Sequence, residues 1–255
     1  MTLNSLLHRL DIERRAIAPF GFSIEQLPHV TRIRSADGSC HVIFHSALSE
    51  DTADAAIDAQ IEHYRSLQVE VEWKVYGHDK PPDLRKRLES RGFAIGQLET
   101  VLVLDLASNV EWVDEPPALP IIRAENPEQV DLFARGASDV FGKDFTFTAN
   151  ELRAAIAAGS TQHLGYVALD GQAPVSVGRL YANTQSIFGG LYGGGTIASH
   201  RGRGLYRAMV AARARDARKL GAKWLIVDAL PTSRPILERL GFVRLTDTWP
   251  CTRRP

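Results

Sequence analysis

The chain has 255 residues, of which 44% are hydrophobic and 24% charged, a composition typical of a globular protein with one or two domains and a sizeable core. Its 30 basic and 30 acidic residues cancel, so the overall charge does not favour nucleic acid or an anionic membrane as a partner. Cys40 and Cys251 lie far apart, which argues against a disulfide framework or a cysteine-rich zinc site and fits a reducing, cytoplasmic compartment. The first residues lack an uninterrupted apolar core and no stretch approaches the length of a membrane-spanning helix, so we expect neither a signal peptide nor a membrane partner.

In the first half, helices and strands alternate. Apolar residues at helical spacing predict helices over residues 3–18 and 50–67 and a short helix over 84–89. The turn Ala36-Asp37-Gly38-Ser39 predicts a hairpin. The segments with strand patterns are 22–33, 41–48, 69–76, a strand from Gly92-Phe93, and 99–106.

The second half is predicted to begin with a strand over 119–124, followed by a helix that Asn126 caps, with Pro127 at its first position. Thr148 and Glu151 form a capping box that predicts a helix to about Ala158. The later elements are predicted as a hairpin around Asp170-Gly171, a strand over 187–198, a helix to 219, a buried strand over 224–229 and a short helix over 236–240. A last strand follows Gly241-Phe242; we expect it to be short, with the strand over 99–106 as a candidate partner.

The turn Arg201-Gly202-Arg203-Gly204 stands between the strand over 187–198 and the helix that follows it. Glycines leave backbone N–H groups unshielded, and these groups lie at the positive end of the helix dipole, so the turn predicts a site for a pyrophosphate. Two arginines add positive charge. Neither the ATP-binding motif G-x-x-x-x-G-K-[ST] nor the dinucleotide motif G-x-G-x-x-G is present in this segment.

The pattern Arg201-x-x-Gly204-x-Tyr206 resembles the R/Q-x-x-G-x-G/A pyrophosphate loop of the GNAT acetyltransferase superfamily, with Tyr206 where Gly or Ala is usual. The order of elements over 119–243 and the segment Ile236-Leu-Glu-Arg-Leu-Gly-Phe242 also resemble that family. The resemblance implies an α/β fold with a central mixed, mostly antiparallel sheet flanked by helices, and acetyl-CoA as acyl donor without a metal. The cofactor-binding residues that it implies are Thr196, Ile197, Arg201, Gly202, Arg203, Gly204, Leu205, Tyr206 and Ser233.

Residues 73–93 and 224–242 repeat one pattern: a strand, a proline break, a short basic helix and Gly-Phe. The repeat suggests two copies of one unit, so we expect a tandem GNAT-like protein with domains at 1–112 and 113–255 and a linker over 109–120.

The first-half helix that corresponds to the CoA-binding one opens with Ser49-Glu50-Asp51-Thr52-Ala53-Asp54. These carboxylates repel a pyrophosphate, so we expect this half to be a degenerate lobe that has lost cofactor binding.

The resemblance also implies transfer of an acyl group to an amine by direct attack in a ternary complex, with the arm of CoA held by a strand that splays from its neighbour. The usual acid position holds Leu237, and the candidates that we name for acid–base chemistry are Asp228, as a buried base, and Tyr192. Asp228 as a turn cap and Tyr192 as a packing aromatic are the alternatives. Gly193-Gly194-Gly195 indicates either close approach of a ligand or a β-bulge.

The loop over 142–147 is either a specificity segment or a core-packing loop. We expect the acceptor to be a small-molecule amine or a peptide. The sequence does not decide whether the chain forms a homodimer. The eight histidines include no metal-binding pair. The basic run on the helix after the turn favours a solvated face over a nucleic-acid site. The alternative function is a non-catalytic acyl-CoA-binding or regulatory interaction module.

Overall fold

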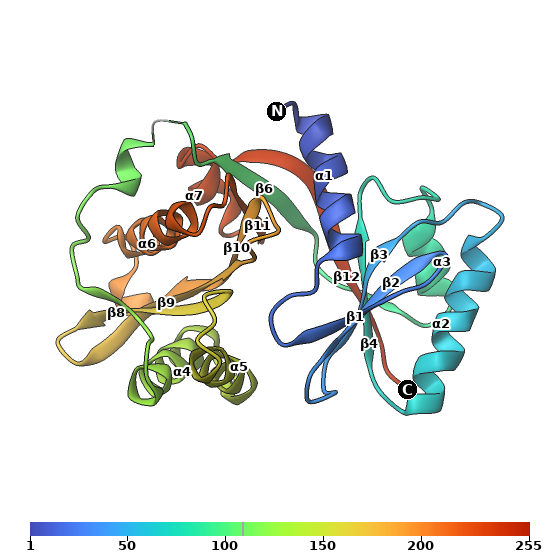
Figure 1. Ribbon diagram of the computed structural model, residues 1–255, viewed down its shortest axis with the longest axis horizontal. Helices are drawn as coiled ribbons and strands as arrows, with labels where there is room; N and C mark the ends of the chain where they lie inside the picture. The colour runs from blue at the N-terminus through green and yellow to red at the C-terminus, as the bar shows by residue number, and fades with distance from the viewer. Residues whose placement is uncertain (109) are drawn as a thin grey trace. The chain divides into compact units, whose positions relative to one another are not determined.

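The computed structural model describes residues 1–108 and 110–255 (Figure 1). The chain divides into two compact units. Unit 1 comprises residues 1–102, 228–237 and 243–255, and unit 2 comprises 103–227 and 238–242. Residues 243–255, which include the last strand, belong to unit 1. The division between the two units therefore does not coincide with the expected boundary between residues 112 and 113. Residue 109, the first of the expected linker, lies outside the described residues.

Unit 1 is a mixed sheet with helices. Its helices are α1 (Leu3–Ala16), α2 (Ala53–Leu67), α3 (Leu84–Ser90) and the start of α7 (Arg234–Arg239). Its strands are β1 (Phe22–Gln26), β2 (Val30–Ser35), β3 (His41–Ser46), β4 (Val71–Tyr76), β5 (Ala94–Ile95), the start of β6 (Glu99–Asp105), the end of β11 (Trp224–Ala229) and β12 (Val243–Arg253). The strand order is β1-β2-β3-β4-β12-β6, and β5 pairs with β12. Trp73, Ile43 and Ile57 are completely buried in its core.

The final strand corrects one expectation. β12 is 11 residues long, not short. Its pairing with β4 runs from Thr248 opposite Tyr76 to Arg253 opposite Val71, and β6 is its other neighbour in the sheet. The expected pairing of the last strand with the segment 99–106 is therefore confirmed, and residues 248–253 also pair with β4, a partner that lies far away in the sequence.

Unit 2 has a sheet in the order β6-β11-β10-β9-β8-β7. Its further strands are β7 (Ile121–Arg123), β8 (His163–Asp170), β9 (Ala173–Ala182) and β10 (Phe188–Thr196). Its helices are α4 (Pro127–Phe141), α5 (Thr146–Ala157), α6 (Leu205–Lys219) and the 3-10 turns Glu111–Val113 and Ala198–His200. β10 is parallel to β11, and the pairs β7–β8, β8–β9 and β9–β10 are antiparallel. The expected mixed sheet flanked by helices is confirmed.

The helices of unit 2 cover opposite faces of the sheet (Figure 1). A Cβ atom on Gly165 in β8 would meet Leu152 of α5 and Phe133 of α4. A Cβ on Gly178 in β9 would instead meet Arg213 of α6. Because side chains alternate along strands, α4 and α5 pack on one face and α6 on the other.

Local capping explains where the helices of unit 2 begin. The Asn126 side chain accepts from the Gln129 amide at 3.0 Å, as predicted for the cap of α4. α5 begins earlier than the expected Thr148, because Asp144 Oδ1 accepts from both the amide and the hydroxyl of Thr146, at 3.1 and 2.7 Å. The aspartate turn therefore replaces the capping box as the start signal.

The internal repeat has a structural counterpart in both places. β4 and α3 are followed by Gly92, with φ +84°, and by the buried Phe93. β11 and α7 are followed by Gly241, with φ +93°, and by a buried phenylalanine, Phe242. In each copy the glycine provides the left-handed turn that ends the short helix and directs the phenylalanine into the core.

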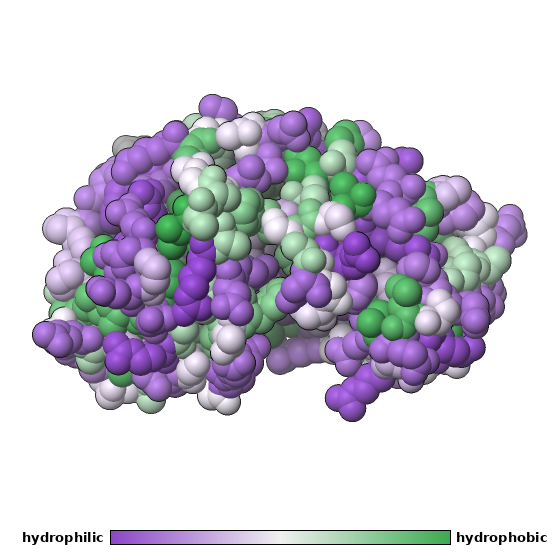
Figure 2. All heavy atoms as spheres, turned by 60° about the horizontal axis from the view of Figure 1, so that its bottom comes forward, coloured by the Kyte–Doolittle hydropathy of each residue, from purple (hydrophilic) through white to green (hydrophobic). Residues whose placement is uncertain are grey.

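On the face drawn in Figure 2, hydrophobic residues are interspersed with hydrophilic ones. Within the described part of the chain, no helix is both long and apolar enough to cross a membrane.

Candidate functional site

β10 separates from its parallel neighbour in the middle of the sheet. The pairing between the two strands joins Phe188, Gly189 and Gly190 to residues 224–226 of β11. β10 continues to Thr196, and over this second part its register is with β9. The strand therefore has the splay that we expected, with one edge of its backbone not in register with β11.

The loop after β10 presents free backbone donors. Gly202 and Gly204 have φ values of +74° and +76°, and no atom lies within 4 Å of the place of a Cβ on either. Among the described residues, neither glycine amide donates a hydrogen bond, and nor does the amide of Leu205, the first residue of α6. No side chain caps this helix. The amides and the helix dipole thus form an open hollow suited to an anion.

The arginines of the loop differ from one another. Arg201 Nε donates to the Thr196 carbonyl at 3.1 Å, so this side chain ties the loop to the end of β10. Arg203 is exposed and forms no ion pair or hydrogen bond within the described part of the chain. Of the two, Arg203 is the positive charge available to a ligand.

Tyr206 occupies the position where the family pattern has a small residue, yet its bulk is directed at the sheet. Its ring lies 3.4 Å from the place of a Cβ on Gly194 in β10. Leu205 is 2% exposed, so its side chain belongs to the core and only its backbone can serve a ligand. The hollow at Gly204 is therefore not filled by the side chains that follow it.

Thr196 and Ile197, two residues whose backbone groups we expected to bind CoA, each have a polar group that is used within the sheet. The Thr196 hydroxyl is 2.9 Å from Ser176 Oγ, and the two groups share a hydrogen bond. The Ile197 amide donates to the Val175 carbonyl at 3.0 Å. The N–H group of Ile197 is thus already paired with β9, and a role for this residue in binding the CoA arm stays a prediction.

The three consecutive glycines of β10 have packing reasons. Gly193, with φ +52°, lies in a bulge between Tyr192 and Gly195. A Cβ on Gly194 would lie 3.0 Å from Nη2 of Arg213, and one on Gly195 would overlap Val140. The bulge interpretation therefore accounts for these glycines.

Arg213, on α6, is buried between the helix and the sheet. Its Nε donates to the Met209 carbonyl at 3.0 Å and its Nη1 to the Arg179 carbonyl at 3.2 Å. Burial lowers the pKa of Arg213 to about 10. This arginine does not lie on the solvated face that the sequence suggested.

The other basic residues of α6 hold the segment expected to be a linker. Arg207 pairs with Glu115, and Arg215 donates to the Val113 carbonyl. Arg218 Nε donates to the Leu106 carbonyl at 3.2 Å. A solvated face was therefore wrong for much of this run, because these arginines bind the backbone and acidic side chains of residues 106–115.

The catalytic candidates lie in different units. Tyr192 of unit 2 is 44% exposed, and its ring meets that of Tyr181 edge-on with centroids 5.0 Å apart. Asp228 belongs to unit 1, where its Oδ2 lies 2.9 Å from Lys74 Nζ. Leu237, at the expected acid position, is completely buried.

Ser233, also of unit 1, donates from its hydroxyl to the Leu230 carbonyl at 3.2 Å. Its own carbonyl accepts from Leu237 N at the start of α7. Ser233 thus stabilises a helix start, and its role toward a cofactor stays a prediction. Within the described residues, no group of His, Cys, Asp and Glu side chains is arranged to hold a metal ion.

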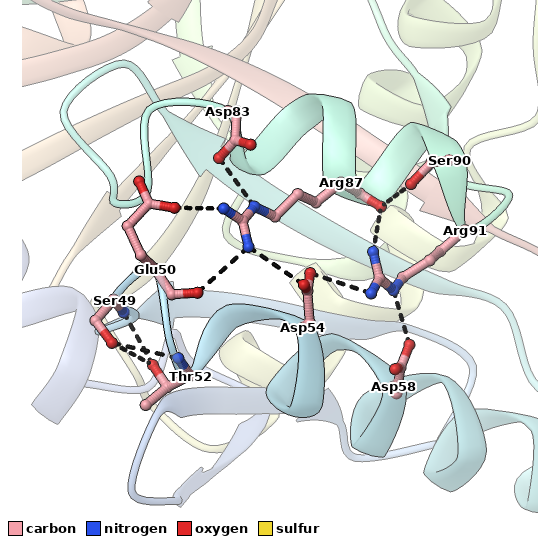
Figure 3. Close-up of polar contacts among 9 residues, drawn as sticks. All are labelled: Ser49, Glu50, Thr52, Asp54, Asp58, Asp83, Arg87, Ser90 and Arg91. Atoms are coloured by element: carbon pink, nitrogen blue, oxygen red, sulfur yellow. Dashed lines mark hydrogen bonds and ion pairs between the residues drawn. The ribbon is translucent and has the colours of Figure 1, made fainter.

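In unit 1 the corresponding helix is α2, and backbone amides at its start are already paired within the chain. The Ser49 amide donates to Thr52 Oγ1 at 2.9 Å, and the Thr52 amide donates to Ser49 Oγ at 3.3 Å (Figure 3). The Ala53 amide donates to the Ser49 carbonyl at 3.1 Å. Three backbone amides at this helix start are therefore paired within the turn itself.

Charged side chains also lie at this helix start. Arg87 of α3 and Arg91, the residue that follows this helix, point toward the first turns of α2 (Figure 3). Their ion-pair partners are Glu50, Asp54, Asp58 and Asp83. Carboxylates therefore occupy the start of α2, where a pyrophosphate would need to approach.

No protein-family model and no curated protein sequence matches the chain. Solved structures with a similar fold do. A GCN5-related N-acetyltransferase from Kribbella flavida aligns with TM-score 0.68 and 16% identity over 99% of this chain and 94% of its own. A tandem GNAT protein from the clavulanic acid biosynthesis pathway aligns with TM-score 0.60 and 14% identity over 99% and 94%. A functionally unknown protein from Staphylococcus epidermidis aligns with TM-score 0.64 and 11% identity over 92% and 95%.

These alignments extend over nearly the whole chain and nearly the whole of each similar structure, so the likeness is not confined to the loop and α6. The likeness of fold agrees with the splayed β10, the glycine loop and the helix that follows it. The chain has the fold of the GCN5-related N-acetyltransferases.

Proposed function

We propose that the chain is an acyl-CoA-dependent N-acyltransferase that uses acetyl-CoA, with its donor site in residues 113–255. The observation that carries the proposal is the loop at Gly202 and Gly204: among the described residues their amides have no acceptor, and no atom lies within 4 Å of the place of a Cβ on either glycine. Acetyl-CoA would supply a thioester, which is an acyl group activated for attack by an amine.

The chain's own contribution to binding begins at the start of α6. The amides of Gly202, Gly204 and Leu205 would donate to the pyrophosphate oxygens, and Arg203 adds a mobile positive charge. Charge-assisted hydrogen bonds of this kind contribute about 1.5–3 kcal/mol each. The fixed backbone needs little reorganisation to accept the anion, so the site is preorganised.

The reaction then depends on positioning. Direct attack requires the amine and the thioester carbonyl to be held together, and positioning alone supplies a large share of such rate enhancements. Tyr192, half-exposed beside the bulge of β10, is the hydroxyl that we propose next to the reacting atoms. Asp228 forms an ion pair with Lys74. Stabilising this lysine is the alternative to a role of Asp228 as general base.

We propose that residues 1–112 are a degenerate GNAT-like lobe without a donor site. The paired amides and the carboxylates at the start of α2 support this proposal. Each chain would then bind a single acetyl-CoA molecule.

Isothermal titration calorimetry with acetyl-CoA tests the donor site. The wild-type chain should bind, and Gly204→Glu should abolish the heat, because its carboxylate would project into the anion hollow. Gly221→Glu is the matched control: Gly221 has φ +90°, open space around it, and a place at the opposite end of α6. Equal affinity in the wild type and in Gly204→Glu would refute the proposed cradle.

Thiol release from acetyl-CoA in the presence of an amine library tests turnover. Release that depends on an added amine supports the transferase. Tight binding of acetyl-CoA with no release for any amine would favour a binding or regulatory module instead.

A further inference from the structure

Several buried nitrogen atoms without a partner lie together on the α4–α5 face of unit 2. Among the described residues, the buried side-chain nitrogen and oxygen atoms with no hydrogen bond include both ring nitrogens of His163 and Nε of Arg179. In the sheet, His163 of β8 is opposite Tyr181 of β9, and Arg179 of β9 is opposite Tyr192 of β10. Unpaired buried polar atoms are rare and call for a functional explanation.

Stacked rings connect these positions. The rings of His163 and Tyr181 stack with centroids 4.1 Å apart, and the Tyr181 ring meets Tyr192 edge-on at 5.0 Å. His163 is only 1% exposed, and burial lowers its pKa to about 3, so the imidazole is neutral at neutral pH. His163 therefore contributes no charge to this cluster at neutral pH.

Arg179 uses one side of its guanidinium within the chain. Its Nη1 donates to the Tyr181 hydroxyl at 3.3 Å and lies 3.9 Å from Oε2 of Glu151 on α5. Its Nη2 has no hydrogen bond or ion pair among the described residues, and neither has Nε. The Nε–Nη2 edge, with two parallel N–H donors, is thus the unpaired one.

This unpaired edge lies beside Gly193 in the bulge of β10. A Cβ on Gly193 would lie 3.5 Å from Nε and 3.6 Å from Nη2 of Arg179. A side chain at this position would therefore pack directly against the edge, and the glycine places none there. Two parallel N–H groups on a planar guanidinium match the two oxygens of a carboxylate.

We propose that the amine acceptor carries a carboxylate, as an amino acid does, and that the Nε–Nη2 edge of Arg179 recognises it. This inference rests on the proposed transferase function and adds the class of acceptor. Glu151 and Arg179 balance each other in charge, so an acceptor with one ammonium and one carboxylate leaves the site neutral. A second negative charge, as on a phosphate dianion, would meet Glu151 without compensation.

The test uses the full chain in two arms. In the first, calorimetry measures the Kd of acetyl-CoA for the wild type, Arg179→Gln, Arg179→Lys and Arg153→Gln. In the second, thiol release is measured with the twenty protein amino acids and with their carboxamides. Binding of N-acetyl amino acids and their carboxamides to the CoA-loaded chain gives the same comparison without turnover.

The wild type should prefer the carboxylate over the carboxamide by about 10- to 100-fold in kcat/KM or in Kd, the range for a charge-assisted pair. Arg179→Gln should reduce this ratio to about one, mainly through KM, with an unchanged Kd for acetyl-CoA. Arg179→Lys should keep part of the preference. Arg153→Gln, which removes an arginine paired with Asp131 on the outside of α5, should keep all of it.

A wild-type chain without preference for carboxylates would overturn the inference, and so would an unchanged preference in Arg179→Gln. If acetyl-CoA binds in the first arm, either result overturns the acceptor class alone. If acetyl-CoA does not bind, the proposed function fails and the acceptor class fails with it.

Discussion

Substitution of Asp228 by asparagine separates two roles for this carboxylate. Lys74 Nζ lies 2.9 Å from Asp228 Oδ2 and 3.0 Å from Glu99 Oε2. The side chains of Lys74, Asp228 and Glu99 are 14%, 19% and 22% exposed. Burial opposes the charge of Lys74, but Asp228 and its other acidic neighbours outweigh burial and raise the pKa of Lys74 well above its usual value. Asp228 is thus a stabilising partner of a buried ammonium.

The expected loss of stability depends on which ion-pair partner Lys74 keeps after the substitution. Breaking a buried ion pair outright costs about 3–5 kcal/mol. Because Glu99 still pairs with Lys74, we expect Asp228→Asn to lower the free energy of unfolding by about 1–3 kcal/mol. The raised pKa of Lys74 makes this stabilisation fully present below about pH 10.4, the usual lysine value, and it is lost as pH rises through the pKa of the folded state.

Urea unfolding at pH 7 and at pH 11 measures this effect, and amine acetylation by the same variant measures catalysis. Glu62→Gln is the control, since Glu62 is 72% exposed in its pair with Arg65 and such pairs contribute about 0–1 kcal/mol. A variant of wild-type stability whose kcat falls by about 100-fold or more, a typical loss for a general base, would refute the ion-pair account.

Three further predictions concern packing, pH and stoichiometry. Gly178→Ala should cost about 1–3 kcal/mol in urea unfolding, because its Cβ would lie 2.8 Å from Cζ of the buried Arg213; a change under about 0.5 kcal/mol would contradict this packing. Burial lowers the pKa of His45 to about 4 and that of His163 to about 3, so the unfolded chain binds more protons at acid pH, and the free energy of unfolding should fall as pH drops from about 6.5 to 4. A flat profile over that range would count against buried neutral histidines. Calorimetry should give a stoichiometry close to one acetyl-CoA per chain and the same value in Arg87→Ala, whereas a second site in either protein would show that unit 1 binds the donor.

Local signals in the sequence predicted the elements that depend on neighbours in the chain. The glycine turn before α6, the Asn126 cap of α4 and the hairpin around Gly171 each rest on a few adjacent residues, and the structure has all three. The start of α5 was missed by two residues, because Asp144 is also a strong local signal and acts earlier in the chain.

Long-range pairing was harder to predict. Residues 248–253 of β12 pair with β4, and no pattern within residues 243–253 specifies that partner. The basic run on α6 looked solvated because its acceptors, the carbonyls of Leu106 and Val113, are backbone groups that carry no sequence signal.

The residues of the proposed acceptor site were missed for a related reason. His163 and Arg179 lie on different strands, and only the register of β8 and β9 places them near each other. The one available signal was Arg179 in the middle of the apolar segment 175–182, since a buried arginine is rare unless it has a partner.

Amide chemical shifts measured as acetyl-CoA is added test most directly whether the amides of Gly202 and Gly204 bind the pyrophosphate. Saturating acetyl-CoA should produce the largest ¹H–¹⁵N shifts at Gly202, Gly204 and Leu205 and none above background at Ala53, the first residue of α2. Unchanged shifts at the two glycines in a chain that is saturated with acetyl-CoA would contradict the claim that this loop binds the pyrophosphate.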